Sequence, residues 1–147
     1  MRLSLIVDTR EQMPLKFKEG FFDEIRSEAR PFADYWAEVD GKEVPLMFER
    51  KGQGDLFQTM THGYKRFKRM LEKAEAVDSK VVLLIEGSMR DIAAGYPYSD
   101  FNGTSMLRKL AMLHVRYDLE YHFFNDRREM ARFIEEEFDA IRRNFKK

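Results

Sequence analysis

Three acidic residues and one lysine in the first third of the chain are of the types that bind a divalent cation and assist hydrolysis. Asp8 ends an apolar run, Asp34 precedes an aromatic segment, and Glu49 stands two positions before Lys51. A hard cation such as Mg²⁺ takes several oxygen ligands, keeps some waters and accepts its remaining ligands from a substrate phosphate. The four residues therefore indicate a magnesium or manganese site that hydrolyses a phosphate ester.

Each of these residues also has an ordinary structural role open to it. Asp8 and Asp34 could cap the turns beside them, and Asp55 could cap a helix. Lys51 could be only the ion-pair partner of Glu49, although residues two apart on a strand point to the same side, as a metal ligand and a catalytic ammonium both require. Glu49 follows an apolar run, where a partly buried carboxylate needs a cation or a donor. The chemical interpretation therefore depends on the four residues together.

The composition is that of a globular protein, and we expect residues 1–147 to form a single domain. Hydrophobic residues make up 44% and charged residues 35% of the chain, and no run approaches the roughly 20 apolar residues of a membrane-spanning helix. The first seven residues lead straight into Asp8 without the small-residue cleavage site of a signal peptide. The chain has no cysteine, which excludes disulfides and thiolate zinc sites. We expect a cytoplasmic protein, or a nucleoid or nuclear one, rather than a secreted one.

Charge is balanced overall but uneven along the chain. The 26 basic and 26 acidic residues give zero net charge, which argues against a surface that coats nucleic acid throughout. Between His62 and Lys73, however, Glu72 is the single acid among several basic residues. This stripe either faces the phosphates of a nucleic acid or is a solvated helix face. Its basic members are Lys65, Arg66, Lys68, Arg69 and Lys73.

The hydrophobic pattern predicts an α/β fold in which strands and helices alternate. Short apolar runs predict buried strands, Asp40-Gly41 predicts a hairpin turn, and apolar residues at steps of three and four predict helices. Such an order is typical of a mixed sheet with helices on both faces. The predicted elements are strand 3–7, a helix or helical turn around 14–29, strands 34–39 and 43–49, helix 55–76, strand 80–86, a partly irregular segment 88–103, a helix capped by Thr104 or Ser105, strand 119–124 and a helix capped by Asp126.

Several of these residues belong to strings that carry a family resemblance. The strings are Val7-Asp8-Thr9-Arg10-Glu11, Asp34-Tyr35, Glu49-Arg50-Lys51 with Asp55, and Leu83-Leu84-Ile85-Glu86-Gly87. Across roughly residues 4–87 they resemble the nuclease domain of the XPF/Hef-type structure-specific endonucleases, with their V-D-x-R-E, G-D-Y and E-R-K-x-x-x-D elements. The resemblance implies a PD-(D/E)XK, restriction-endonuclease-like fold: a mixed central sheet flanked by helices on both faces.

The resemblance also implies roles for individual residues. Asp8, Asp34, Glu49 and the backbone carbonyl of Arg50 would ligate magnesium or manganese, and Lys51 would orient or deprotonate the attacking water. Residues expected to support the site are Arg10, Glu11 and Asp55, of which Asp55 would hold the Glu49–Lys51 segment or the helix start. Residues expected to contact DNA are Lys65, Arg66, Lys68 and Arg69. The implied activity is metal-dependent endonucleolytic cleavage of branched or single-strand-containing DNA, in repair or recombination.

The sequence departs from the family pattern in three places. Ala33 replaces the glycine before Asp34, Gly63 is followed by Tyr64 rather than arginine, and no tandem helix-hairpin-helix module follows within the 147 residues. We therefore keep two alternatives, a catalytically silent DNA-binding partner subunit and a nuclease acting on ordinary duplex DNA. A homodimer or a separate DNA-targeting protein would then supply the grip on DNA.

The remaining polar and aromatic residues point less clearly to chemistry. His62, His114 and His122 have no metal-ligand spacing. Tyr96, Tyr98 and Phe101 either anchor their loop to the core or stack on unpaired bases. The apolar stripe of the last predicted helix is ordinary core packing, or in part the surface of a dimer.

Overall fold

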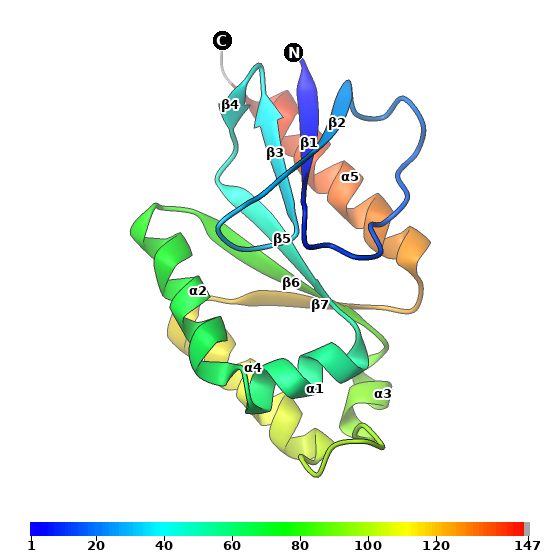
Figure 1. Cartoon of the computed structure of the whole chain (residues 1–147), viewed down its shortest axis with the longest axis vertical. Helices are drawn as coiled ribbons and strands as arrows, with labels where there is room; N and C mark the ends of the chain where they lie inside the picture. Colours follow the sequence, from blue (N-terminus) through cyan, green and yellow to red (C-terminus); the bar gives the residue numbers. More distant parts are fainter. Residues whose placement is uncertain (146–147) are drawn as a thin grey trace.

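Residues 1–145, the part of the chain that the computed structural model describes, form one mixed β-sheet with helices packed on both faces (Figure 1). The strands are β1 (Leu3–Asp8), β2 (Glu24–Glu28), β3 (Tyr35–Val39), β4 (Lys42–Glu43), β5 (Leu46–Lys51), β6 (Lys80–Glu86) and β7 (Glu120–Phe124). The helices are α1 (Gln53–Thr61), α2 (Tyr64–Ala76), α3 (Met89–Ala93), α4 (Gly103–Tyr117) and α5 (Arg127–Asn144). No helix among these residues is long and apolar enough to cross a membrane.

The strand order is β2-β1-β3-β5-β6-β7, with β4 paired to β3. Strand β1 runs parallel to β2 and antiparallel to β3, β3 runs antiparallel to β5, and β5, β6 and β7 are parallel. The predicted mixed sheet is therefore confirmed. This topology brings the end of β1 and the start of β3 beside β5, because Val7 pairs with Tyr35 and Tyr35 pairs with Phe48.

Alternation along the strands divides the core between the two faces of the sheet. On one face, Val82 and Leu84 of β6 pack with Ile134 and Phe138 of α5. On the other, Leu83 and Ile85 of the same strand belong to a second core that contains the buried residues of α1, α2 and α4. Helix α5 thus covers one face alone, and α1, α2 and α4 cover the other (Figure 1).

The helix predicted for residues 14–29 is wrong. Glu24–Glu28 is strand β2, and the residues before it form an irregular segment with a left-handed Gly20 at φ 79°. The aromatic residues at helical spacing serve the core in a different way. The ring of Phe17 lies 5.4 Å from that of Phe22 and 5.7 Å from that of Tyr35, centroid to centroid, so the segment packs on the sheet without coiling.

Smaller differences affect two helices. The helix predicted from 55 to 76 is divided at His62-Gly63 into α1 and α2, because the Gly63 N–H turns back to the Gln58 carbonyl. Helix α4 is capped by Asn102, whose side chain accepts from the Ser105 N–H at 2.7 Å, and not by Thr104 or Ser105. The predicted Asp126 cap of α5 is confirmed.

Replacing Gly103 with alanine tests the packing of α3 against α4. A Cβ at Gly103 would lie 2.1 Å from the Ala93 carbonyl oxygen, so Gly103→Ala forces the two helices apart. We expect a loss of about 1–3 kcal/mol in the free energy of unfolding. Thr104→Ala, at the exposed neighbouring position, is the matched control and should change stability by less than about 0.5 kcal/mol in urea unfolding. Equal stabilities for the two variants would contradict this packing.

Candidate active site

A cavity of about 380 Å³ lies beside the ends of β1 and β5, on the sheet face that α2 covers. The predicted site residues that line it are Asp8, Arg10, Asp34, Glu49, Lys51, Arg66 and Arg69. Lys73 of α2, a member of the basic stripe, also lines it. The cavity therefore has acidic residues on the sheet side and basic residues on the helix side.

Alternation along β5 puts two site residues into the cavity and turns the residue between them away. The Lys51 Nζ lies 3.2 Å from the Glu49 Oε2, and both side chains are largely shielded from solvent. Arg50 points to the other face of the sheet, where Glu11 binds it. The prediction that Glu49 and Lys51 share one side of a strand is confirmed.

Asp34 is held at the cavity by main-chain contacts. Its N–H donates to the Phe48 carbonyl at 3.0 Å, its carbonyl accepts from the Asp8 N–H at 2.9 Å, and its Oδ2 accepts from the Arg50 N–H at 2.8 Å. The preceding Ala33 has φ 63°, in the left-handed region that favours glycine, at the position where the resembling family has glycine. Burial and the neighbouring Glu49 carboxylate raise the pKa of Asp34 to about 8.

Asp8 is buried and already bound by donors on both oxygens. Its Oδ1 accepts from the Arg30 N–H at 2.7 Å, and its Oδ2 accepts from the Arg10 Nε at 2.9 Å. Burial opposes its charge, but the bonds from Arg10 and Arg30 outweigh it and lower the pKa of Asp8. Arg10 thus pairs with a carboxylate, one of the two roles predicted for it.

The carboxylate oxygens of the cavity are ligands that suit a hard cation, but their positions in this structure do not yet form a complete metal site. Asp34 and Glu49 repel each other in one cavity, a tension that a divalent cation would relieve. Among residues 1–145, however, no three acidic or histidine side chains stand close enough together to hold a metal ion. Asp8 would have to exchange its bonds to Arg10 for a bond to the metal in order to complete the predicted set.

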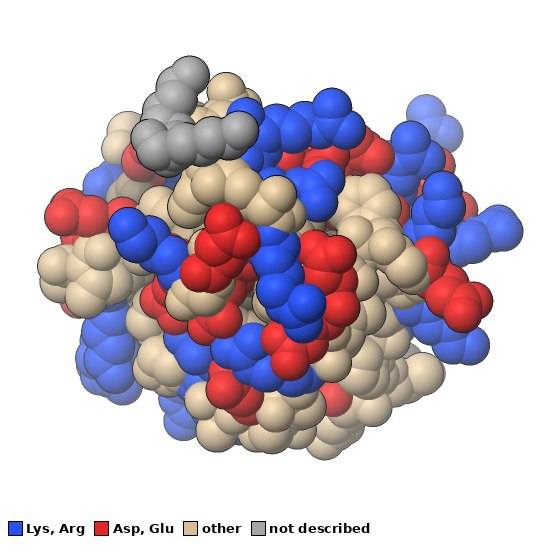
Figure 2. Space-filling view, turned by 90° about the horizontal axis from the view of Figure 1, so that it is seen from above, with Lys and Arg blue, Asp and Glu red and all other residues tan. Residues whose placement is uncertain are grey.

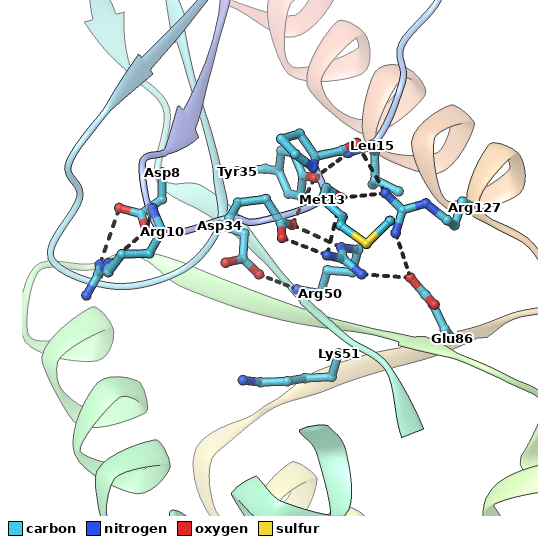
Figure 3. Close-up of polar contacts among 12 residues, drawn as sticks. Asp8, Arg10, Met13, Leu15, Asp34, Tyr35, Arg50, Lys51, Glu86 and Arg127 are labelled. Carbon is cyan, nitrogen blue, oxygen red and sulfur yellow. Dashed lines mark hydrogen bonds and ion pairs between the residues drawn. The ribbon is translucent and has the colours of Figure 1, made fainter. Parts of the chain in front are cut away.

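A second polar network lies behind the cavity, on the α5 face of the sheet (Figure 3). Arg50 donates to Glu11 through Nη2 at 2.6 Å and Nε at 2.9 Å, and through Nη1 to Glu86 at 2.7 Å. Arg127, at the start of α5, also donates to Glu86, at 3.1 Å, and the Tyr35 hydroxyl donates to Glu11 at 3.0 Å. These bonds hold β5 on the sheet face opposite the cavity. Glu11 contacts the strand through the Arg50 side chain, and its supporting role in the site stays a prediction.

Not every predicted residue reaches the cavity. Asp55 is exposed in the first turn of α1, whose N-cap is Gly52 without a side-chain bond, and it does not line the cavity. Lys65 and Lys68 also lie outside the cavity lining. Metal ligation by the Arg50 carbonyl stays a prediction.

Comparison with known proteins identifies the family and the fold. A family model described as the ERCC4 domain matches residues 7–136. The chain therefore belongs to the ERCC4 domain family, whose members are generally nucleases. No curated protein matches the sequence.

The fold is that of a solved nuclease-family structure. XPF from Aeropyrum pernix matches with a TM-score of 0.71 and 18% identity, over 96% of this chain and 66% of that one. The same protein in a complex with DNA matches with a TM-score of 0.65 and 18% identity, over 95% and 64%. The chain thus spans just under two thirds of the length of those structures. The predicted family and the predicted fold are both confirmed.

The raised pKa of Asp34 makes metal-free stability depend on pH. Between its ordinary pKa near 3.8 and about 8, folded Asp34 keeps a proton that the unfolded chain releases, so stability falls as pH rises through this range. Asp34→Asn removes the charge and can still accept from the Arg50 N–H. We expect this variant to be more stable than the natural protein by about 1–3 kcal/mol at pH 8, and by less at pH 5, in urea unfolding with EDTA. An unchanged difference between the two pH values would contradict it.

The network behind the cavity is tested by two neighbouring arginines. Arg127→Ala removes donors to Glu86 and to the Met13 and Pro14 carbonyls and should lower the free energy of unfolding by about 1–3 kcal/mol. Arg128→Ala, at an exposed position with no ion pair among the described residues, should change it by less than about 0.5 kcal/mol. Thermal unfolding measures both, and equal losses would remove the network's structural role.

Proposed function

We propose that this domain is a metal-dependent endonuclease that hydrolyses phosphodiester bonds in DNA. The observation that carries the proposal is the convergence of Asp34, Glu49 and Lys51 on one cavity whose opposite wall is basic. Family membership supports the same reaction class. Full retention of the acidic and lysine residues favours an enzyme over a silent partner subunit.

Different residues would bind the cation, orient the attacking water and bind the substrate phosphates. Asp34 and Glu49 would hold magnesium or manganese, with Asp8 and the Arg50 carbonyl as further oxygen donors. When bound, the cation stabilises the charge that develops on the phosphate and lowers the pKa of a bound water. Lys51, kept beside Glu49 by their ion pair, would orient the attacking water. Arg66, Arg69 and Lys73 would bind the phosphates of the substrate strand.

The substrate class that we propose is branched or single-strand-containing DNA. A phosphodiester must enter between the sheet and α2 to reach Lys51, and a strand freed from pairing enters such a cavity more readily than an intact duplex. One of the similar structures, XPF from Aeropyrum pernix, is a complex with DNA, which supports DNA as the polymer. A second copy of the chain or a separate targeting protein would add further contacts with the DNA.

Loss of Lys51 or of the Asp34 charge tests the catalytic assignment. With Mg²⁺ and a forked DNA, Lys51→Ala and Asp34→Asn should each reduce the cleavage rate by about 100-fold or more. Lys42→Ala, an exposed lysine on β4, is the charge-matched control and should cleave at the natural rate. Full cleavage by either site variant would refute the assignment.

A panel of DNA structures tests the substrate class. The natural protein with Mg²⁺ should cleave flaps and forks faster than an intact linear duplex of the same sequence. Equal rates on all of them would favour the duplex-nuclease alternative. If none of these DNA structures is cleaved with Mg²⁺ or with Mn²⁺, the result would favour the silent-subunit alternative.

A further inference from the structure

Basic side chains gather on α2 and α4, both in the lining of the catalytic cavity and beyond it, without acidic partners among residues 1–145. Helix α4 contains no acidic residue, and the two glutamates of α2 lie in its C-terminal half. Within residues 1–145, none of the basic side chains on these helices forms an ion pair. They are Lys65, Arg66, Lys68, Arg69, Lys73, Arg108, Lys109 and Arg116. By contrast, basic and acidic side chains are closely mixed on the end of the molecule seen in Figure 2.

Two aromatic rings stand among these cations. A cavity of about 240 Å³ between α2 and α4 is lined by Tyr64, Phe101 and Lys109, among others. The Lys109 Nζ lies 4.1 Å from the centroid of the Tyr64 ring and 4.9 Å from that of Phe101, and the Lys68 Nζ lies 4.6 Å from Tyr64. Both rings are half-buried. Part of each ring is therefore accessible to a ligand, which would share the ring with these ammonium groups.

The pocket places several positive charges where they are partly shielded from solvent. Burial and the nearby Lys68 lower the pKa of Lys109, which donates to the Met60 carbonyl. Exposed Arg108 and Arg116 complete the charged lining, and Met112 adds an apolar wall. A ligand that is anionic and also carries flat apolar faces would satisfy all of these groups.

The pocket and the catalytic cavity lie on opposite flanks of α2. Arg66, Arg69 and Lys73 line the catalytic cavity, whereas Tyr64 lines the pocket and carries Lys68 over its ring. Lys65 is exposed on the same helix. An unpaired basic surface thus joins the two sites over α2, whose diameter with side chains is about 10–12 Å.

We infer that the pocket binds a single strand of DNA, stacking its bases on Tyr64 and Phe101 while Lys68, Lys109 and Arg108 bind its phosphates. Unpaired bases expose their faces, and those of a duplex do not, so the pocket selects single strands. This inference rests on the proposed function, because the bound strand continues over α2 into the catalytic cavity. It gives a physical reason for preferring branched DNA.

Binding without metal tests the inference separately from cleavage. In EDTA, fluorescence anisotropy of the full chain would be compared on a labelled oligothymidylate and on an abasic strand of equal length. Tyr64→Leu and Phe101→Leu should each weaken binding of the oligothymidylate by about 5- to 100-fold and leave the abasic strand unchanged. Tyr64→Phe keeps the ring and should bind as the natural protein does.

A second pair of variants tests how much positive charge in the pocket contributes to DNA binding. Lys68→Gln should weaken both strands alike and reduce the slope of log affinity against log salt by about one. Lys16→Gln, on the irregular segment before β2, removes the same charge without touching the pocket and should change neither strand. Circular dichroism would confirm that each variant is folded.

Four outcomes would overturn the inference. One is equal loss on oligothymidylate and abasic strand in the Leu variants, and another is competition by duplex as effective as that by single strand. The third is a change in the molecular mass of the Leu variants, measured by light scattering, while their DNA binding is unchanged. That result would show that the pocket contacts a second copy of the chain. Aromatic-dependent binding without Mg²⁺-dependent cleavage would support the pocket and refute the nuclease. Cleavage of forks by Leu variants with undiminished DNA affinity would refute the pocket alone.

Discussion

The site depends on the fixed orientation of three consecutive residues at the end of β5. Glu49 and Lys51 reach the cavity because they share a face of the strand, and Arg50 must then point to the other face. Arg50 is bound there by Glu11 and Glu86, while its own N–H donates to the Asp34 carboxylate on the cavity side. One strand end is thus held from both sides of the sheet.

The cavity brings together carboxylates whose proximity does not stabilise the fold. Asp34 is buried beside Glu49, and its burial together with the Glu49 carboxylate raises its pKa. The main-chain bonds of Asp34 and the left-handed Ala33 keep the side chain in place despite this tension. Local tension of this kind, maintained by well-packed surroundings, is typical of functional sites. The basic surface of α2 and α4 is a second such feature, with cations that form no ion pair within residues 1–145.

Much of the framework could be predicted because it is encoded locally. The apolar run ending at Asp8, the Asp40-Gly41 turn and the Asp126 cap each act over a few residues. Strand β2 could not be predicted, since the apolar residues before and within it recur at helical spacing. The contacts of Phe17 with Phe22 and with Tyr35 arise only in the tertiary fold. Most residues named from the family motifs line one cavity, whereas Asp55 does not; their catalytic roles stay predictions. The ion pairs of Arg50 with Glu86 and of Arg127 with Glu86 span 36 and 41 residues, and neither has a local signal in the sequence.

Divalent cation binding is the central claim, and Mn²⁺ can be located directly by its anomalous scattering in crystals of the natural protein and of Asp34→Asn. We expect an anomalous peak between the carboxylates of Asp34 and Glu49, with Asp8 turned from Arg10 towards the ion, and no such peak in the variant. Crystals soaked in Mn²⁺ with no peak in the cavity, or with an equal peak in Asp34→Asn, would contradict it.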